Sequence, residues 1–119
     1  MSRLRQLLYA SRARGTPLAR HYALPLPALS TPWREAELLA VDFETSGLDT
    51  RNDRILSMGW VRISQARIRM SSARHVLVRT DIDNREGVGQ SAVVHGLTDT
   101  DVAAGIAPCE AVRQLLGEL

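Results

Sequence analysis

The chain has 119 residues, 45% of them hydrophobic and 24% charged, which suits one small globular domain. Its single cysteine, Cys109, excludes an internal disulfide and a zinc site built from several cysteines. No apolar run reaches the roughly 20 residues that a membrane-spanning helix needs, so we expect no membrane partner.

The charge is unevenly spread along the chain. Residues 1–34 contain six arginines and no acid, whereas residues 35–119 contain nine arginines and thirteen acids. The formal net charge of +2 therefore combines a basic arm of +6 with an acidic remainder of −4. Such an arm can contact nucleic acid, remain solvated or dock on the rest of the chain. An arginine-rich, acid-free start is also typical of a mitochondrial transit peptide, which stays an alternative.

A short helix and a linker are predicted at the start of the chain. In residues 2–14 leucines recur at helical spacing between arginines, which predicts a basic amphipathic helix that stops near Gly15. Residues 16–33 contain four of the five prolines. Because proline disfavours both helix and central strand, we expect an extended linker here, with Leu29 and Trp33 as its anchors on the rest of the chain.

Three strands are predicted next, joined as an antiparallel meander. Residues 38–44 form the first strand, and the apolar run 54–63 predicts a second strand that is buried on both faces. Residues 66–70 alternate between arginines and apolar residues, which predicts a third strand with Ile68 and Met70 facing inward. Whether this strand continues to residue 79 stays open.

Two short helices are predicted at the end of the chain. Thr98, with Asp101 three residues later, is typical of a capping box at a helix start. Pro108 suits the first turn of a second helix. The overall pattern predicts a small α/β domain.

Two acids stand inside the first predicted strand, in the stretch AVDFETSGL (residues 40–48). Alternate side chains of a strand share a face, so Asp42 and Glu44 point one way and Val41 and Phe43 the other. Two carboxylates at this spacing, roughly 7 Å, can jointly hold divalent cations. A solvent-facing amphipathic strand explains the pattern equally simply. A one-metal or phospho-acceptor pocket in an unrelated α/β domain is a third interpretation.

Two longer stretches resemble one enzyme family. VDFETSGLDTRNDRILSMGWVRI (41–63) resembles the first motif of the DEDD superfamily of 3′–5′ exonucleases, which includes the proofreading epsilon subunit of bacterial DNA polymerase III and ribonuclease T. SAVVHGLTDTDVAAGIAPCEAVRQLLGEL (91–119) resembles the segment and helices that follow in the family. The resemblance covers residues 36–119. It implies an incomplete ribonuclease-H-like α/β fold, with a three-stranded antiparallel meander and C-terminal helices, after a basic helix and Pro-rich linker in residues 1–35.

The resemblance also implies an activity. Family members hydrolyse a nucleic-acid 3′ end to nucleoside 5′-monophosphates, with two Mg²⁺ or Mn²⁺ ions as cofactors. It implies a nucleic acid with a free 3′ end as partner, DNA favoured over RNA, together with DNA polymerase subunits, in a bacterial cytoplasm. Asp42 and Glu44 would be catalytic metal ligands. The residues expected to border the terminal nucleotide are Thr45, Ser46, Gly47, Leu48 and His95.

The family site needs four acids and a histidine base, and this sequence matches only the first two acids. His21, His75 and His95 all precede or lie outside the position of the base. We therefore expect residues 36–119 to be a domain portion truncated before the second and third motifs, and inactive alone. Its first strand would keep an unpaired apolar edge that invites association. The alternative is a non-catalytic remnant that binds nucleic acid or a protein partner.

Overall fold

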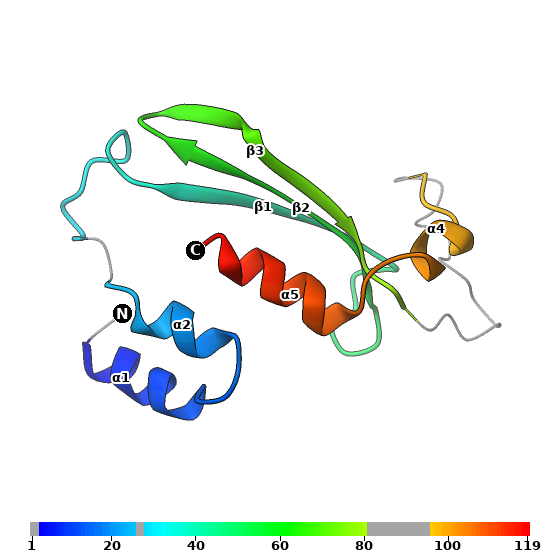
Figure 1. The fold of residues 1–119 in the computed structure, drawn as a ribbon, viewed down its shortest axis with the longest axis horizontal. Helices are drawn as coiled ribbons and strands as arrows, with labels where there is room; N and C mark the ends of the chain where they lie inside the picture. Colours follow the sequence, from blue (N-terminus) through cyan, green and yellow to red (C-terminus); the bar gives the residue numbers. More distant parts are fainter. Residues whose placement is uncertain (1–2, 26–27, 81–95) are drawn as a thin grey trace.

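A computed structural model of the chain describes residues 3–25, 28–80 and 96–119. It is a small α/β fold with a three-stranded antiparallel sheet, in which β2 lies between β1 and β3 (Figure 1). The predicted meander and C-terminal helices are confirmed. The elements are α1 (Arg3–Arg12), α2 (Leu18–Ala23), β1 (Leu38–Thr45), β2 (Ile55–Ser64), β3 (Arg67–Leu77), α4 (Asp99–Ala103) and α5 (Pro108–Gly117).

A two-residue turn joins β2 to β3. Gln65 and Ala66 have φ angles of 53° and 57°, and Ser64 and Arg67 pair on either side of them. Two successive left-handed residues are the signature of a type I′ turn, which matches the twist of the flanking strands. Neither residue is glycine, so each carries a conformational penalty of roughly 1–2 kcal/mol.

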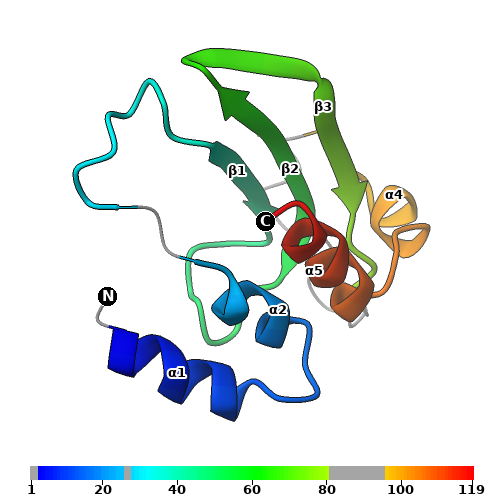
Figure 2. The ribbon, with the colours of Figure 1, turned by 60° about the vertical axis from the view of Figure 1, so that its left-hand side comes forward.

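Helix α5 packs on one face of the sheet, as Figure 2 shows from the side. Residues directly opposite each other on neighbouring strands share a face. Phe43, Met58 and Val76 form one such row, and Trp60 lies in the next. Met58 and Trp60 are buried in a cluster with Ala111 of α5. The core therefore lies between α5 and the middle of the sheet.

Main-chain hydrogen bonds attach the start of α5 to the end of β3. The Ile106 amide donates to the Leu77 carbonyl (2.9 Å), and the Arg79 amide donates to the Ile106 carbonyl (2.7 Å). These bonds make a parallel bridge between Val78 and Ile106. A side chain at Gly105 would lie 2.7 Å from the Leu77 carbonyl oxygen, so this close approach requires glycine.

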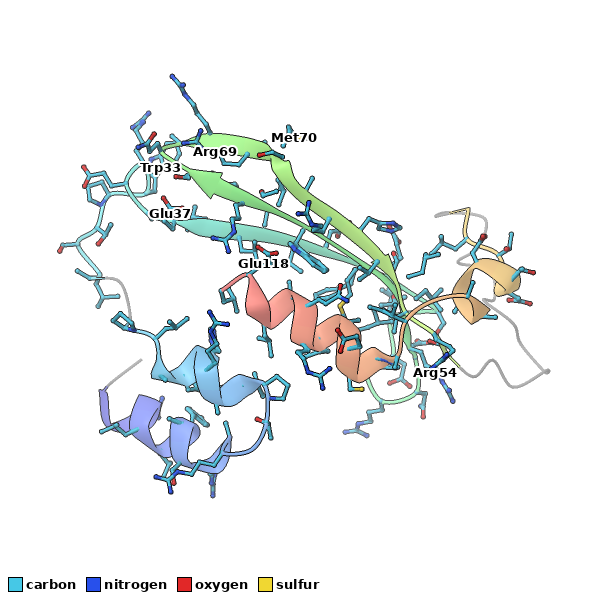
Figure 3. All side chains as sticks on the ribbon, in the orientation of Figure 1. Trp33, Glu37, Arg54, Arg69, Met70 and Glu118 are labelled. Atoms are coloured by element: carbon cyan, nitrogen blue, oxygen red, sulfur yellow. The ribbon has the colours of Figure 1, made fainter. Side chains whose placement is uncertain are left out.

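The other end of α5 is held by an ion pair. The Arg62 Nε donates to a Glu118 carboxylate oxygen at 3.0 Å, and its Nη2 donates to the Glu118 carbonyl at 2.6 Å. In Figure 3 the Glu118 side chain lies between α5 and the sheet. The helix is therefore fixed to the sheet near both of its ends.

Helix α4 begins as the sequence predicts. Thr98 and Asp101 form a complete capping box, in which each side chain bonds the main chain of the other residue. Val102 of α4 is fully buried against Leu56 of β2. Pro108 occupies the first turn of α5, which is also as predicted.

The prediction of an extended linker over residues 16–33 is wrong in part. Helix α2 forms between Pro17 and Pro25, because a proline is tolerated at a helix start and another just beyond its end. Leu29 and Trp33 do not anchor the segment, since they are 103% and 58% exposed. Instead the Arg34 guanidinium lies 4.6 Å from the centre of the Trp33 ring.

The predicted third strand exists as β3, but the predicted burial of its apolar side chains is wrong. The strand runs unbroken to Leu77, with a register shift opposite Trp60 and Arg62. Ile68 and Met70 are 60% and 72% exposed rather than inward. Ile68 pairs with Ile63, whose side chain points away from α5, and Figure 3 shows Met70 on that same side. Within the described ranges, no helix is both long and apolar enough to cross a membrane.

Candidate metal-binding site on strand β1

Strand β1 places its two acids on one face of the sheet. Asp42 lies opposite Gly59 and Glu44 opposite Ser57, whereas Phe43 shares a row with the core residue Met58. The predicted alternation of β1 is therefore confirmed by the pairing register. The two carboxylates point away from α5, at a spacing of roughly 7 Å along the strand.

Both acids are accessible and lack protein partners. Asp42 is exposed and Glu44 is half-buried. Over the described part of the chain, neither carboxylate accepts a hydrogen bond or joins an ion pair. Two neighbouring negative charges without a cation repel each other. Their donor oxygens suit Mg²⁺ or Mn²⁺, so the pair fits a divalent ion as a partial ligand set.

The loop after β1 is fixed by Asp53. The Ser46 hydroxyl donates to Asp53 Oδ1 at 2.8 Å, and the Asp49 amide donates to Asp53 Oδ2 at 2.7 Å. A side chain at Gly47 would lie 2.5 Å from Asp53 Oδ2. Because Asp53 is held from two sides, it cannot move aside. Gly47 is therefore required for the loop to close on this carboxylate.

Asp49 organises the same loop from its outer side. The Arg51 amide and the Asn52 side chain both donate to its carboxylate, at 3.0 Å and 2.6 Å. The Arg51 hydrogen bond, followed by that of Asn52, lowers the pKa of Asp49 below its ordinary value. Asp49 and Asp53 therefore both accept main-chain amides of this loop and stabilise its turn.

The loop leaves two main-chain donors available beside the acids. The Thr45 hydroxyl donates to the Gly47 carbonyl at 2.7 Å, and the Ser46 amide donates to the Arg54 carbonyl at 2.9 Å. Among the described residues, the amides of Gly47 and Leu48 have no such partner. The Leu48 side chain is 99% exposed. Gly47 and Leu48 can therefore offer two amides and an apolar side chain to a ligand.

A shallow apolar hollow opens next to Asp42. It has a volume of about 290 Å³. It exists because Gly59, directly opposite Asp42, has no side chain to fill the face. Sequence reasoning missed this hollow, although an isolated glycine within a strand signals a close approach or a gap. The residues lining it on this face include Ala40, Asp42, Gly59, Val61, Met70 and Ala73.

The structure brings together only part of the predicted site. His75 shares the row of Asp42 and Gly59, but it lies two strand spacings, roughly 10 Å, from Asp42. Within residues 3–25, 28–80 and 96–119, no three His, Cys, Asp or Glu side chains group closely enough to hold a metal. His95 lies outside the described residues. No family model and no curated protein matches this chain. The resemblance to DEDD exonucleases stays a prediction from sequence.

Proposed function

We propose that Asp42 and Glu44 are two of the metal ligands of a 3′–5′ exonuclease with a ribonuclease-H-like fold, of the polymerase III epsilon type. The observation that carries this proposal is the paired carboxylates on one face of β1. They are accessible, and among the described residues they have no hydrogen-bond or ion-pair partner. Two accessible carboxylates on one face of a strand supply oxygen donors of the kind that Mg²⁺ and Mn²⁺ prefer.

The surroundings of the acids support a nucleotide as the substrate. The amides of Gly47 and Leu48 can donate hydrogen bonds to a terminal sugar or phosphate. The exposed Leu48 side chain can pack against a base. The hollow beside Asp42 is apolar apart from that carboxylate, which suits a sugar or base edge. Thr45 and Ser46 act differently, since their hydroxyls hold the loop in shape.

Asp42 and Glu44 would bind and orient Mg²⁺ or Mn²⁺ through their carboxylate oxygens. Bound in this way, such cations stabilise both the attacking and the leaving oxygen of a phosphodiester hydrolysis. The family pattern also requires two further acids and a histidine base. We therefore expect this chain to bind an ion at Asp42 and Glu44 without turning over an oligonucleotide.

Paramagnetic broadening by Mn²⁺ tests the proposal. Substoichiometric Mn²⁺ should broaden the NMR amide signals of Val41 to Thr45 and of Ser57 and Gly59, because these residues surround the two carboxylates. The Asp42→Asn and Glu44→Gln variants should each lose this local broadening. Glu110→Gln on α5 is the matched control and should keep it. Broadening spread evenly over the thirteen acids of the chain would contradict the proposal.

A non-catalytic role in binding nucleic acid or a protein partner is the second candidate. It is favoured by the finding that only two acids meet at the site among the described residues. The two candidates differ in their dependence on metal. If an oligonucleotide with a free 3′ end binds equally with and without Mn²⁺, and equally to Asp42→Asn, the non-catalytic role is supported instead.

A further inference from the structure

The candidate site cannot attract a nucleic acid by charge. Asp42 and Glu44 add two negative charges to a region, residues 35–119, whose formal net charge is −4. A nucleic-acid strand is a polyanion, and most of its affinity for proteins comes from cationic contacts to phosphates. The net positive charge of the chain lies in residues 1–34, with six arginines and no acid.

The arm presents these arginines on a folded scaffold. Helices α1 and α2 form a hairpin in which the Tyr9 and Tyr22 rings stack with centroids 5.4 Å apart. Ala13, between the helices, is only 7% exposed, and its carbonyl accepts a 2.7 Å hydrogen bond from the Thr16 hydroxyl. The α1–α2 hairpin is therefore an ordered, basic surface.

A cavity of about 540 Å³ separates the turn of this hairpin from α5. Its walls carry two arginines, Arg20 from α2 and Arg113 from α5, and no carboxylate is among its lining residues. Arg113 is paired with Glu110 on the same helix. Over the described residues, Arg20 has no hydrogen-bond or ion-pair partner. The cavity therefore has an uncompensated positive charge on one wall.

We propose that the α1–α2 hairpin and this cavity bind the phosphate backbone of a single nucleic-acid strand, through Arg12, Arg14, Arg20 and Arg113. The identity of the strand as a substrate rests on the function proposed above. Arginine suits this role because its planar fork matches phosphate oxygens. A strand can enter the cavity that Arg20 and Arg113 line, whereas a flat lipid surface cannot.

The geometry predicts that this contact depends on the length of the strand. Both Figure 1 and Figure 2 show the hairpin on the same side of the sheet as α5. Asp42 and Glu44 point to the opposite side. A strand held in the cavity therefore has to pass around the sheet to reach the acids. A short ligand at the acids gains nothing from the arginines, and a long one gains from both.

The experiment is a salt titration of binding in EDTA. The full chain is mixed with a labelled single strand of roughly 16 nucleotides, the upper end of known site sizes. With four phosphate contacts, the logarithm of the binding constant should fall against the logarithm of salt with a slope of about −3. The variant Arg12→Ala/Arg14→Ala/Arg20→Ala should lose about 2 of this slope and bind about 100-fold more weakly at roughly 0.1 M salt.

The matched control removes the same charge elsewhere. Arg67, Arg69 and Arg74 are exposed on β3, away from the hairpin, and their triple alanine variant should keep most of the slope. Circular dichroism of both variants checks that the fold survives. An equal loss of salt slope in both variants would mean that oligonucleotide binding depends only on the net charge of the chain. That result overturns the proposal. The proposal is also overturned if the chain binds phosphatidylserine vesicles while the arm variant binds the oligonucleotide as tightly as the original chain does.

The two proposals fail in different ways. The Asp42→Asn/Glu44→Gln variant should bind the long strand in EDTA at least as tightly as the original chain, because it removes negative charge without touching the arm. If Mn²⁺ does not localise to β1 but the arm variant loses its salt slope, the metal site is wrong and the arm is right. If Mn²⁺ localises to β1 but the arm variant keeps its salt slope, the metal site is supported and the proposed role of the arm is wrong.

Discussion

Strands β1 and β2 are neighbours in one sheet, but they differ in how deeply their side chains are buried. Along β2 the residues Leu56 to Met58 and Trp60 are buried, whereas no residue of β1 is. The two candidate ligands lie on β1. The stability of the fold therefore depends mainly on β2 and its contacts with α4 and α5. The exposed residues of β1, which include the candidate ligands, contribute less to it. Substitutions on the two strands test this division of roles.

The sharpest test uses two residues from one row of the sheet. Met58 and Phe43 are paired across β2 and β1, but they are 2% and 45% exposed. Met58→Ala should lower the free energy of unfolding by about 3 kcal/mol, because it empties a closed core. Phe43→Ala should lower it by about 1 kcal/mol, since less apolar area leaves contact. Urea unfolding measures both. Equal losses would mean that β1 is covered in solution and that the division is wrong.

The second test is Gly105→Ala at the junction of β3 and α5. The new methyl group would meet main-chain atoms of Leu77 and Arg79, which cannot move without breaking the bridge to Ile106. We expect a loss of about 2 kcal/mol in unfolding free energy. Metal binding at Asp42 in the remaining folded fraction should not change. Gly117→Ala, at the end of α5 where the space is open, is the control and should be neutral or slightly stabilising.

The third test strengthens the β2–β3 half. Replacing Gln65 with Asn and Ala66 with Gly supplies residues that adopt positive φ readily at a type I′ turn. Unfolding free energy should rise by about 1 kcal/mol. The Mn²⁺ affinity of the acids on β1 should stay the same. A fall in stability would contradict a type I′ turn at these two residues.

The smallest effect concerns pH and the Thr98–Asp101 capping box. The Thr98 hydroxyl, then the Thr98 amide, lowers the pKa of Asp101 below its ordinary value. A lowered folded-state pKa means that the stabilisation is present above the unfolded value of about 3.9 and is lost as pH falls through the folded value. Asp101→Asn should therefore unfold earlier than the original chain at pH 7, with the difference closing below about pH 4. A constant difference down to pH 2 would exclude this mechanism.

Local patterns predicted the parts of the fold that local forces decide. The three strands follow from runs and alternation of apolar residues, and the start of α4 follows from the spacing of Thr98 and Asp101. The faces of Asp42 and Glu44 follow from strand geometry alone. Each of these features depends on residues close together in sequence.

Features set by distant contacts were not predictable. The exposure of Ile68 and Met70 depends on where α5 lies, and alternation carries no information about that. The hollow beside Asp42 needs the register that brings Gly59 opposite it. Gly105 is required only because the chain passes close to Leu77. In each case the deciding neighbour is on another element.

The bridge between Val78 and Ile106 has a consequence for how the chain folds. The β2–β3 hairpin closes over two residues and can form in microseconds. The bridge joins positions far apart in sequence. Because closing this loop costs conformational entropy, the bridge should form only after the hairpin has formed. Docking of α5 should then be the late, rate-limiting event. In hydrogen exchange the amides of Arg79 and Ile106 should open together with α5, earlier than those of β2.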